Sequence, residues 1–442
     1  MARPRVSALP REMLQEILVK LPTADILRCC CVCTLWRSVV RNASFQQLHA
    51  ARYVGTDKDL ALLVSEKCEP GGCYEAGVFD VSSGKIMCSV ANVPGYRLAN
   101  LCNGFLCFAA PHSGDLPAVV YNPVTGQKVE LPEAPSLEGL GLGRRHVFAL
   151  GFSPSTNEYK LFRLSSSMAD DESTVDVCTL GDRRGWRQHP YLFAHRPVDD
   201  GSPPVFVGGT LYVVTCRGDR NKRPDRILEI DVASEEHRTY RLPDFEEPVD
   251  DVRVSVFELS GQVCLAVNTV KWYRPKLVFW VMLEGSNEEG QFRWHPRYSF
   301  KLDANLTRGG TMQYDCYSNL PRAAWLDHDG MLCYRVGDTV YMYDTNYSPC
   351  PHVDTLTWDE QLQLPATGEP PSDDRSWNVC GGYRPTLLSP LTLVSPPSEE
   401  KFEHILVRAL RSHKSKQPRR SAPSGCRTCW NQRAAKRIRS TR

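Results

Sequence analysis

Cysteine and histidine are the residues of this 442-residue chain whose chemistry is easiest to recognise from spacing. Cys426 and Cys429 form a CxxC pair, and the nearest preceding histidines are His404 and His413. That spacing is irregular for zinc, so two free thiols are expected there and a zinc site is the alternative. The other histidines are scattered without a paired ligand spacing. The sequence therefore predicts no metal site and no cofactor.

A glycine-rich segment and a cluster of cysteines resemble chemical sites, but neither has the features that such a site requires. The glycines at 139, 141 and 143 are followed by no Lys-Ser or Lys-Thr pair, which a phosphate-binding loop requires. Cys29, Cys30, Cys31 and Cys33 fall in a helical pattern, where thiols act as small apolar residues. No catalytic residue is predicted, and we expect a chain that is not an enzyme.

The net charge of +2 conceals three segments of different charge. Residues 1–52 carry +5, residues 53–403 carry −15, and residues 404–442 carry +12 with no acidic residue. The segment 396–442 is predicted to be a disordered basic tail. Nuclear import or contact with nucleic acid is one hypothesis for it, and a solvated, solubilising tail is the other. The nuclear-import candidates are Lys414, Lys416, Arg419, Arg420, Lys436, Arg437 and Arg439.

Membrane insertion and secretion are not expected. No run of eighteen apolar residues occurs, and charged residues stand near the N-terminus where a signal peptide would be apolar. The 18 cysteines are therefore expected to be reduced. The predicted location is the nucleus, the cytoplasm or both.

The N-terminal 52 residues are predicted to form a module of three short helices. In the first, from about Pro10 to Leu21, Leu14, Ile17, Leu18 and Leu21 repeat at helical spacing, and Met13 widens that apolar face. Thr23 is expected to cap the second helix, and Asn42 to end the third. Because 21 of the 36 residues from Val6 to Arg41 are apolar, so small a module cannot shelter them all. Part of this surface must meet another protein or the next domain.

The residues of this module resemble an F-box, the motif that binds the Skp-type adaptor of SCF ubiquitin ligases. Both Leu-Pro pairs, the Leu-Arg at 27–28 and the Trp-Arg-Ser at 36–38 occur in order at the expected spacing. The three cysteines at 29–31 depart from the larger aliphatic or basic residues usual there. The resemblance implies an adaptor, with a cullin beyond it, as partners, and the positive charge suits a generally acidic adaptor. By resemblance, the adaptor-binding residues are Leu9, Pro10, Leu18, Pro22, Leu27, Val32 and Trp36.

The middle of the chain, residues 53–395, contains a sixfold repeat. An apolar strand followed by Asp or Asn and a turn occurs six times, with the equivalent positions at 80, 122, 176, 231, 282 and 344. The mean interval is near 53 residues. Further apolar strands opened by Gly104, Gly209, Gly261 and Gly330 are interpreted as the inner strands. A four-stranded unit of this length, with almost no helical periodicity, predicts a β-propeller of about six four-stranded blades. The segments 60–64 and 386–394 are expected to share one blade.

The middle region also resembles the kelch-like F-box-associated domain of plant F-box proteins. The pieces 103–107 and 121–126 carry that resemblance best, although a Gly-Gly pair is missing from most repeats. The combined resemblance implies a mainly β protein that serves as a substrate receptor, with an unknown target protein held on the propeller loops. Two alternatives remain at this point. One is a propeller scaffold without ligase activity, capped by its own helices, and the other is a propeller enzyme with polar residues at its central channel.

Overall fold

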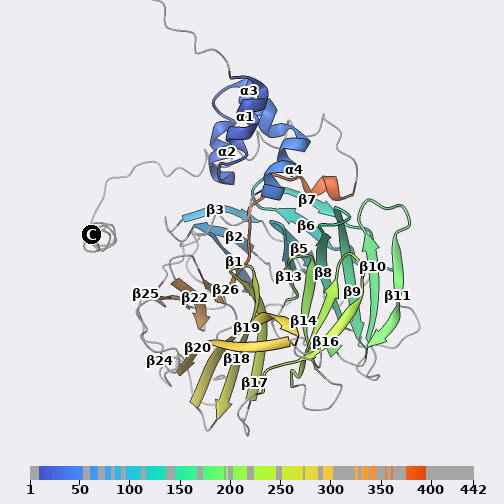
Figure 1. The fold of residues 1–442 in the computed structure, drawn as a ribbon, viewed down its shortest axis with the longest axis vertical. Coiled ribbons are helices and arrows are strands. Elements are labelled where there is room, and N and C mark those ends of the chain that lie inside the picture. The colour runs from blue at the N-terminus through green and yellow to red at the C-terminus, as the bar shows by residue number, and fades with distance from the viewer. Residues whose placement is uncertain are drawn as a thin grey trace, which may run out of the picture. The chain divides into compact units, whose positions relative to one another are not determined.

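The computed structural model describes residues 9–394, except for 53–59, 68–74, 81–84, 91–95, 111–115, 136–144, 167–172, 194–195, 198–202, 217–222, 245–250, 272–273, 287–291, 302–323, 327–330, 337–338, 345–353, 356–359 and 362–374. Four short helices come first, and strands make up nearly all of the rest (Figure 1). The basic tail, with its import candidates and its CxxC pair, and the glycines at 139–143 lie outside the described residues.

The helices are α1 (Arg11–Leu18), α2 (Thr23–Cys29), α3 (Thr34–Arg41) and α4 (Ala43–Arg52). The three predicted helices are present, and α4 is an addition to them. Asn42 ends α3 as expected, but its Oδ1 also accepts hydrogen bonds from the backbone N–H groups of Ser44 (2.9 Å) and Phe45 (3.3 Å). Asn42 therefore ends α3 and also caps α4, because its amide oxygen accepts hydrogen bonds from the first backbone N–H groups of α4.

Thr23 does not cap α2, contrary to prediction. Pro22 precedes the helix without a side-chain cap, and the Thr23 hydroxyl donates to the carbonyl oxygen of Pro385 at 3.1 Å. The hydroxyl is buried, so it must be paired, and a distant carbonyl pairs it in place of the helix's own amide groups.

The strands form six sheets, numbered here as blades in chain order. Blade 1 contains β26 (Arg375–Cys380), β1 (Leu60–Lys67), β2 (Glu75–Asp80) and β3 (Lys85–Val90). Blade 2 contains β4 (Arg97–Cys102), β5 (Phe105–Ala109), β6 (Val119–Asn122) and β7 (Gln127–Glu130). Blade 3 contains β8 (Arg145–Ser153), β9 (Glu158–Ser166), β10 (Ser173–Thr179) and β11 (Trp186–Phe193).

The later blades carry additional short strands. Blade 4 contains β12 (Arg196–Pro197), β13 (Val205–Val207), β14 (Thr210–Cys216), β15 (Arg226–Asp231) and β16 (His237–Arg241). Blade 5 contains β17 (Asp251–Leu259), β18 (Gln262–Lys271), β19 (Arg274–Ser286), β20 (Phe292–Lys301) and β24 (Asp354–Thr355). Blade 6 contains β21 (Ala324–Leu326), β22 (Met331–Val336), β23 (Thr339–Asp344) and β25 (Glu360–Gln361).

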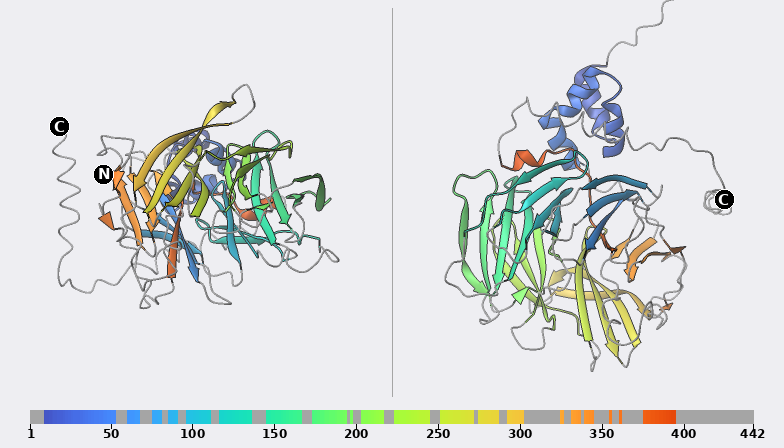
Figure 2. Two further views of the ribbon diagram at one scale, coloured as in Figure 1. Left: turned by 90° about the horizontal axis from the view of Figure 1, so that it is seen from below. Right: turned by 180° about the vertical axis from the view of Figure 1, so that it is seen from behind.

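The six sheets confirm the predicted β-propeller, which Figure 2 shows from two further directions. Every predicted repeat copy lies on the third strand of its sheet: β2, β6, β10, β15, β19 and β23. Two alignments were wrong, because Met282 lies four residues before the end of β19 and Asp176 lies three residues before the end of β10. Asp176 lies inside β10, where its buried carboxylate pairs with Arg163, and the turn begins at Thr179 instead.

The predictions of the inner strands and of ring closure both need correction. The strands that lie beside one another from blade to blade are β4, β8, β13, β17, β21 and β26, whereas the predicted inner strands are β5, β14, β18 and β22, second in their sheets. The first blade is closed by β26, which pairs with β1 from Leu62 opposite Cys380 to Lys67 opposite Arg375. The segment 386–394 contributes no strand and ends in a short 3₁₀ helix, η1 (Pro390–Leu393).

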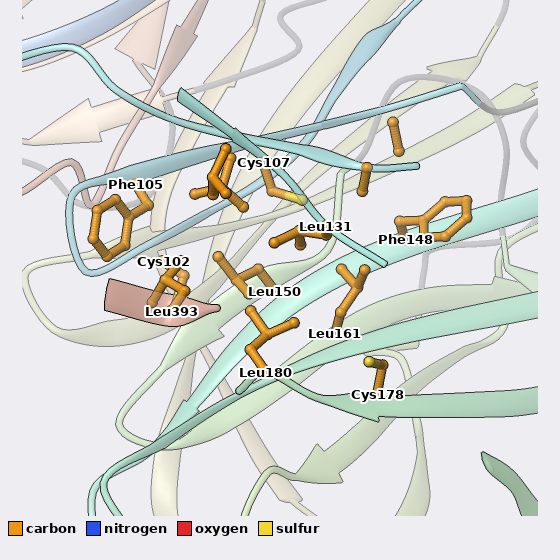
Figure 3. Packing of buried hydrophobic residues seen from close by; sticks show 14 residues of the cluster. Cys102, Phe105, Cys107, Leu131, Phe148, Leu150, Leu161, Cys178, Leu180 and Leu393 are labelled. Carbon is orange, nitrogen blue, oxygen red and sulfur yellow. The ribbon is translucent and has the colours of Figure 1, made fainter. Parts of the chain in front are cut away.

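The apolar core lies between consecutive blades. Strand β5 shows why its sequence is continuously apolar: Phe105 and Cys107 face blade 3, while Leu106 and Phe108 face blade 1. Figure 3 shows the cluster between blades 2 and 3, to which Phe105, Cys107, Leu150 and Leu161 all belong. Both faces of this strand are buried, so neither tolerates a polar residue.

A repeated tryptophan contact also joins the blades. Trp186 Nε1 donates to the carbonyl oxygen of Pro132 at 3.0 Å, from blade 3 to the end of blade 2. Trp294 Nε1 donates to the carbonyl oxygen of Arg241, also at 3.0 Å, from blade 5 to blade 4. The two pairs are 54 and 53 residues apart in sequence, close to the repeat length, so they are equivalent contacts.

Residues 381–394, called here the closing segment, leave β26 and run along blade 2. The Asn122 side chain donates to the carbonyl oxygens of Thr386 (3.0 Å) and Leu388 (2.7 Å). Arg384 forms an ion pair with the buried Glu258 of blade 5. Leu393 belongs to the core between blades 2 and 3. The segment thus holds three blades together, directly after the strand β26 that closes the ring.

Candidate protein-docking site on the helical module

The apolar face of helix α1 is covered along one side only. Leu14 and Leu18 are 1% and 0% exposed and pack inside the module. Met13 and Ile17 occupy the other side, one helical turn apart, and are 52% and 46% exposed. Leu9, just before the helix, is also exposed. The apolar face predicted from the spacing is therefore covered on its Leu14 and Leu18 side and exposed on its Met13 and Ile17 side.

A second exposed apolar site lies between α2 and α3. Val32 is 62% exposed, and Leu35 at the start of α3 is exposed as well. Cys31 and Cys33, on either side of Val32, are exposed, while Cys30 is fully buried. The expectation that all four thiols act as core residues is thus wrong for these two. We define the docking surface as Leu9, Met13, Ile17, Val32 and Leu35.

The predicted adaptor-binding residues fall into three groups. Leu9, Pro10 and Val32 are exposed, whereas Pro22, Leu27 and Trp36 are partly buried. Leu18 requires a correction: it has no exposed surface, so it supports the module from inside and does not present itself to a partner. Sequence reasoning did not assign Met13, Ile17 and Leu35 to the site. The available signal for Met13 and Ile17 was the width of the apolar face of α1, which exceeds what one neighbouring helix covers.

The buried side of the module fixes the geometry of the exposed side. Ile26, Val39, Val40 and Phe45 join Leu14 and Leu18 as fully buried side chains from all four helices. Arg37 Nε donates to the carbonyl oxygen of Cys30 at 3.1 Å, which ties α3 to the end of α2. These contacts position the segment that carries Val32.

His49 joins α4 to the end of the first helical segment. Its Nε2 lies 3.0 Å from the carbonyl oxygen of Leu21, and its ring stacks on Phe45 with centroids 6.1 Å apart. Burial lowers the pKa of His49 from its ordinary value of 6.5, although the hydrogen bond to the Leu21 carbonyl opposes that shift.

This pKa shift predicts that acid weakens the module. The unfolded chain binds a proton on His49 more readily than the folded chain does, so stability is fully present above pH 6.5 and is lost as the pH falls below it. An NMR titration of the imidazole, assigned with a His49→Gln variant, should give a pKa below 6.5. A value at or above 6.5 would contradict the structure.

The part of the chain that the structure describes contains neither a cluster of metal ligands nor a membrane-spanning helix. Within it, no three His, Cys, Asp or Glu side chains lie together as metal ligands. No described helix combines the length and the hydropathy that crossing a bilayer requires. The buried ion pairs are structural contacts: Lys160 and Glu235, 2.6 Å apart, join blades 3 and 4, and Arg163 and Asp176 join two strands of blade 3.

A small helical module that exposes part of its apolar surface, followed by a six-bladed β-propeller, defines a binding protein of two modules. Comparison with protein families agrees: residues 6–47 match the F-box domain, and residues 63–303 match the F-box associated beta propeller domain. The second match covers more than half of the chain. The chain belongs to the family of F-box proteins with an associated β-propeller.

Relatives of the chain occur in Arabidopsis thaliana. The F-box protein At1g52495 is 24% identical over 331 residues, which cover 71% of this chain and 76% of the relative. The F-box protein At3g07870 is 26% identical over 351 residues, 73% of this chain and 77% of the relative. The F-box/kelch-repeat protein At3g04660 is 24% identical over 305 residues, 64% and 72% of the two chains.

Proposed function

We propose that this chain is the substrate receptor of an SCF-type ubiquitin ligase. The helical module binds a Skp-type adaptor, which connects it to a cullin, and the propeller binds the protein to be ubiquitinated. The observation that carries this proposal is the docking surface, whose five residues are among the six large apolar side chains that remain exposed on the described helical module, although the module has its own buried core. Patches of this kind mark sites of protein association.

The energetics of the docking surface suit a stable complex. Covering apolar surface favours association, and the part of that gain that exceeds the entropy lost on binding appears as affinity. Anchors that fill pockets at the centre of an interface contribute most of the binding free energy. The arrangement of Met13 and Ile17 one turn apart suits a helix that lays one face against a partner.

The propeller contributes position and not bond chemistry in this proposal. Blades locked by buried ion pairs and tryptophan hydrogen bonds form a rigid frame, and the loops between strands are the variable surface for a target. Holding a target lysine near the transfer site raises its effective concentration. The ligase complex would therefore accelerate transfer through proximity.

A binding measurement with purified proteins tests the proposed function. The full chain is titrated with a Skp-type adaptor in a calorimeter, and the mixture is then examined by gel filtration. The expected result is a saturable 1:1 complex with a dissociation constant below about 1 μM, which corresponds to about 8 kcal/mol. Absence of a complex at higher concentrations would contradict the proposal and favour a propeller scaffold that does not act in a ligase.

We further propose that the basic tail directs nuclear import and takes no part in adaptor binding. Its charge of +12 without acidic residues supports this role. Deleting residues 404–442 should leave the affinity for the adaptor unchanged and reduce nuclear accumulation of a fluorescent fusion. An unchanged distribution in cells would refute the import proposal and leave a solubilising tail.

A further inference from the structure

We propose that Cys31 and Cys33 form a thiol-modification site that takes low-molecular-weight disulfides of the glutathione class, and that the adduct closes the docking surface. The inference rests on the proposed function for its consequence, but not for the modification itself. Its basis is the placement of two exposed thiols on either side of Val32.

The four clustered thiols differ in accessibility. Cys31 and Cys33 are exposed, Cys29 is partly buried, and Cys30 is fully buried. Burial raises the pKa of the Cys30 thiol to about 11, assisted by the neighbouring thiols and opposed by Arg41 and Arg37. Since the thiolate is the attacking species, Cys30 is inert, and reaction is directed to the two exposed positions.

The backbone leaves the Cys33 thiol available for reaction. Cys33 is the residue before α3, in extended conformation, and its side chain makes no capping hydrogen bond. Arg37 lies on the first turns of α3, and the Arg28 side chain at the end of α2 is 80% exposed. Because Arg28 forms an ion pair with Asp25, the attraction for an anionic reagent such as oxidised glutathione comes from Arg37 and from the N-terminus of α3.

The proposed reaction is a thiol–disulfide exchange. The thiolate sulfur of Cys31 or Cys33 attacks one sulfur of oxidised glutathione, the S–S bond of the reagent breaks, and a new S–S bond joins cysteine to glutathione. The departing glutathione thiolate takes up the proton that the protein thiol has lost. The cysteine sulfur is oxidised, one glutathione half is reduced, and the oxidant is the reagent itself.

The adduct would remove the most exposed part of the docking surface. Val32 lies between the two thiols and is 62% exposed. A tripeptide with two carboxylates on either side would cover this side chain and introduce polar groups that an apolar pocket cannot pair. Loss of one anchor and insertion of unpaired charge each weaken an interface.

The test uses the full chain in its reduced form. It is treated with millimolar oxidised glutathione, freed of reagent, and digested with trypsin, which releases residues 29–37 because Arg28 and Arg37 bound that peptide. Tandem mass spectrometry should place adducts on Cys31 and Cys33 and leave Cys30 unmodified. Adducts spread evenly over the four thiols, or placed on Cys30 first, would overturn the site.

The consequence for docking is measured separately. Treated chain should bind a Skp-type adaptor at least tenfold more weakly than untreated chain, and dithiothreitol should restore the affinity. The double variant Cys31→Ser, Cys33→Ser should bind the adaptor normally, and oxidised glutathione should not change its affinity. The affinity of the Cys29→Ser variant should still fall on treatment. Modified chain that binds with full affinity would overturn the closure. If untreated chain fails to bind, the proposed function fails, and the peptide analysis still decides the modification site.

Discussion

Replacing Ile17 with aspartate is expected to weaken adaptor binding at least about 100-fold, or about 3 kcal/mol. Ile17 is 46% exposed and lies one turn from Met13 on the uncovered side of α1. In the free chain, an aspartate there would be solvated and would leave the core untouched. In the complex it would place a carboxylate in an apolar interface, where an unpaired charge is strongly unfavourable. Calorimetric titration of the variant measures the loss.

Leu116→Asp is the matched control for this experiment. Leu116 lies in blade 2 and is 42% exposed, close to the exposure of Ile17. This variant should bind the adaptor with unchanged affinity. Leu18→Asp is unsuitable as a test, because Leu18 is fully buried and the variant would unfold the module. Equal affinity of the Ile17 and Leu116 variants, both folded, would contradict the docking surface.

Replacing Gly104 with alanine is expected to lower the free energy of unfolding by about 3 kcal/mol or more, from backbone strain and steric overlap together. Gly104 has a φ of +81°, which alanine adopts only with strain. A Cβ there would also come closer than 3.0 Å to the carbonyl oxygen of Arg384 in the closing segment. That oxygen is backbone, so it cannot rotate away, and the closing segment would have to shift. Chemical denaturation measures the difference.

Gly126→Ala separates the two contributions. Gly126 lies in the same blade and has a φ of +71°, but a Cβ there would meet nothing within 4 Å. It should therefore cost only the conformational strain, about 1 kcal/mol. If the two variants lose equal stability, the close packing of the closing segment against blade 2 would be refuted.

The sixfold repeat could be predicted from the sequence because every blade of a propeller needs the same pattern of apolar strand residues and turn residues. Within the described residues, the third strands β6 and β15 are rich in apolar residues and end in turns, where the side-chain oxygens of Asn122 and Asp231 accept nearby backbone N–H groups. Asp176 was aligned as a turn residue, but it lies inside a strand and pairs with the buried Arg163. Composition alone does not distinguish those two uses.

The segment that closes the ring could not be predicted from the sequence, because closure depends on pairing between strands that are far apart in the chain. The closing strand β26 has the alternating sequence RSWNVC, with polar residues between apolar ones. The segment 386–394 is more continuously apolar, which favours a buried strand on pattern alone. It is apolar because it packs into the core between blades 2 and 3 through Leu393 and lies against blade 2.

The helical module shows what periodicity leaves open. Helical spacing identified the apolar residues of α1, but the pattern does not say which side of that apolar face the neighbouring helices cover. The structure assigns Leu14 and Leu18 to the interior and Met13 and Ile17 to the surface. The same holds for the cysteines. Cys30 is buried and Cys31 and Cys33 are exposed, and this difference follows from where α2 ends.

Oxidative footprinting of Met13 tests the docking surface most directly, because this side chain is 52% exposed in the free chain. Hydroxyl radicals should oxidise it readily in the chain alone and several-fold more slowly in a saturated complex with a Skp-type adaptor. Met282, partly buried between blades 4 and 5, is the internal reference and should react at the same rate in both samples. An unchanged Met13 rate in a complex shown by gel filtration to be saturated would mean that the adaptor binds elsewhere.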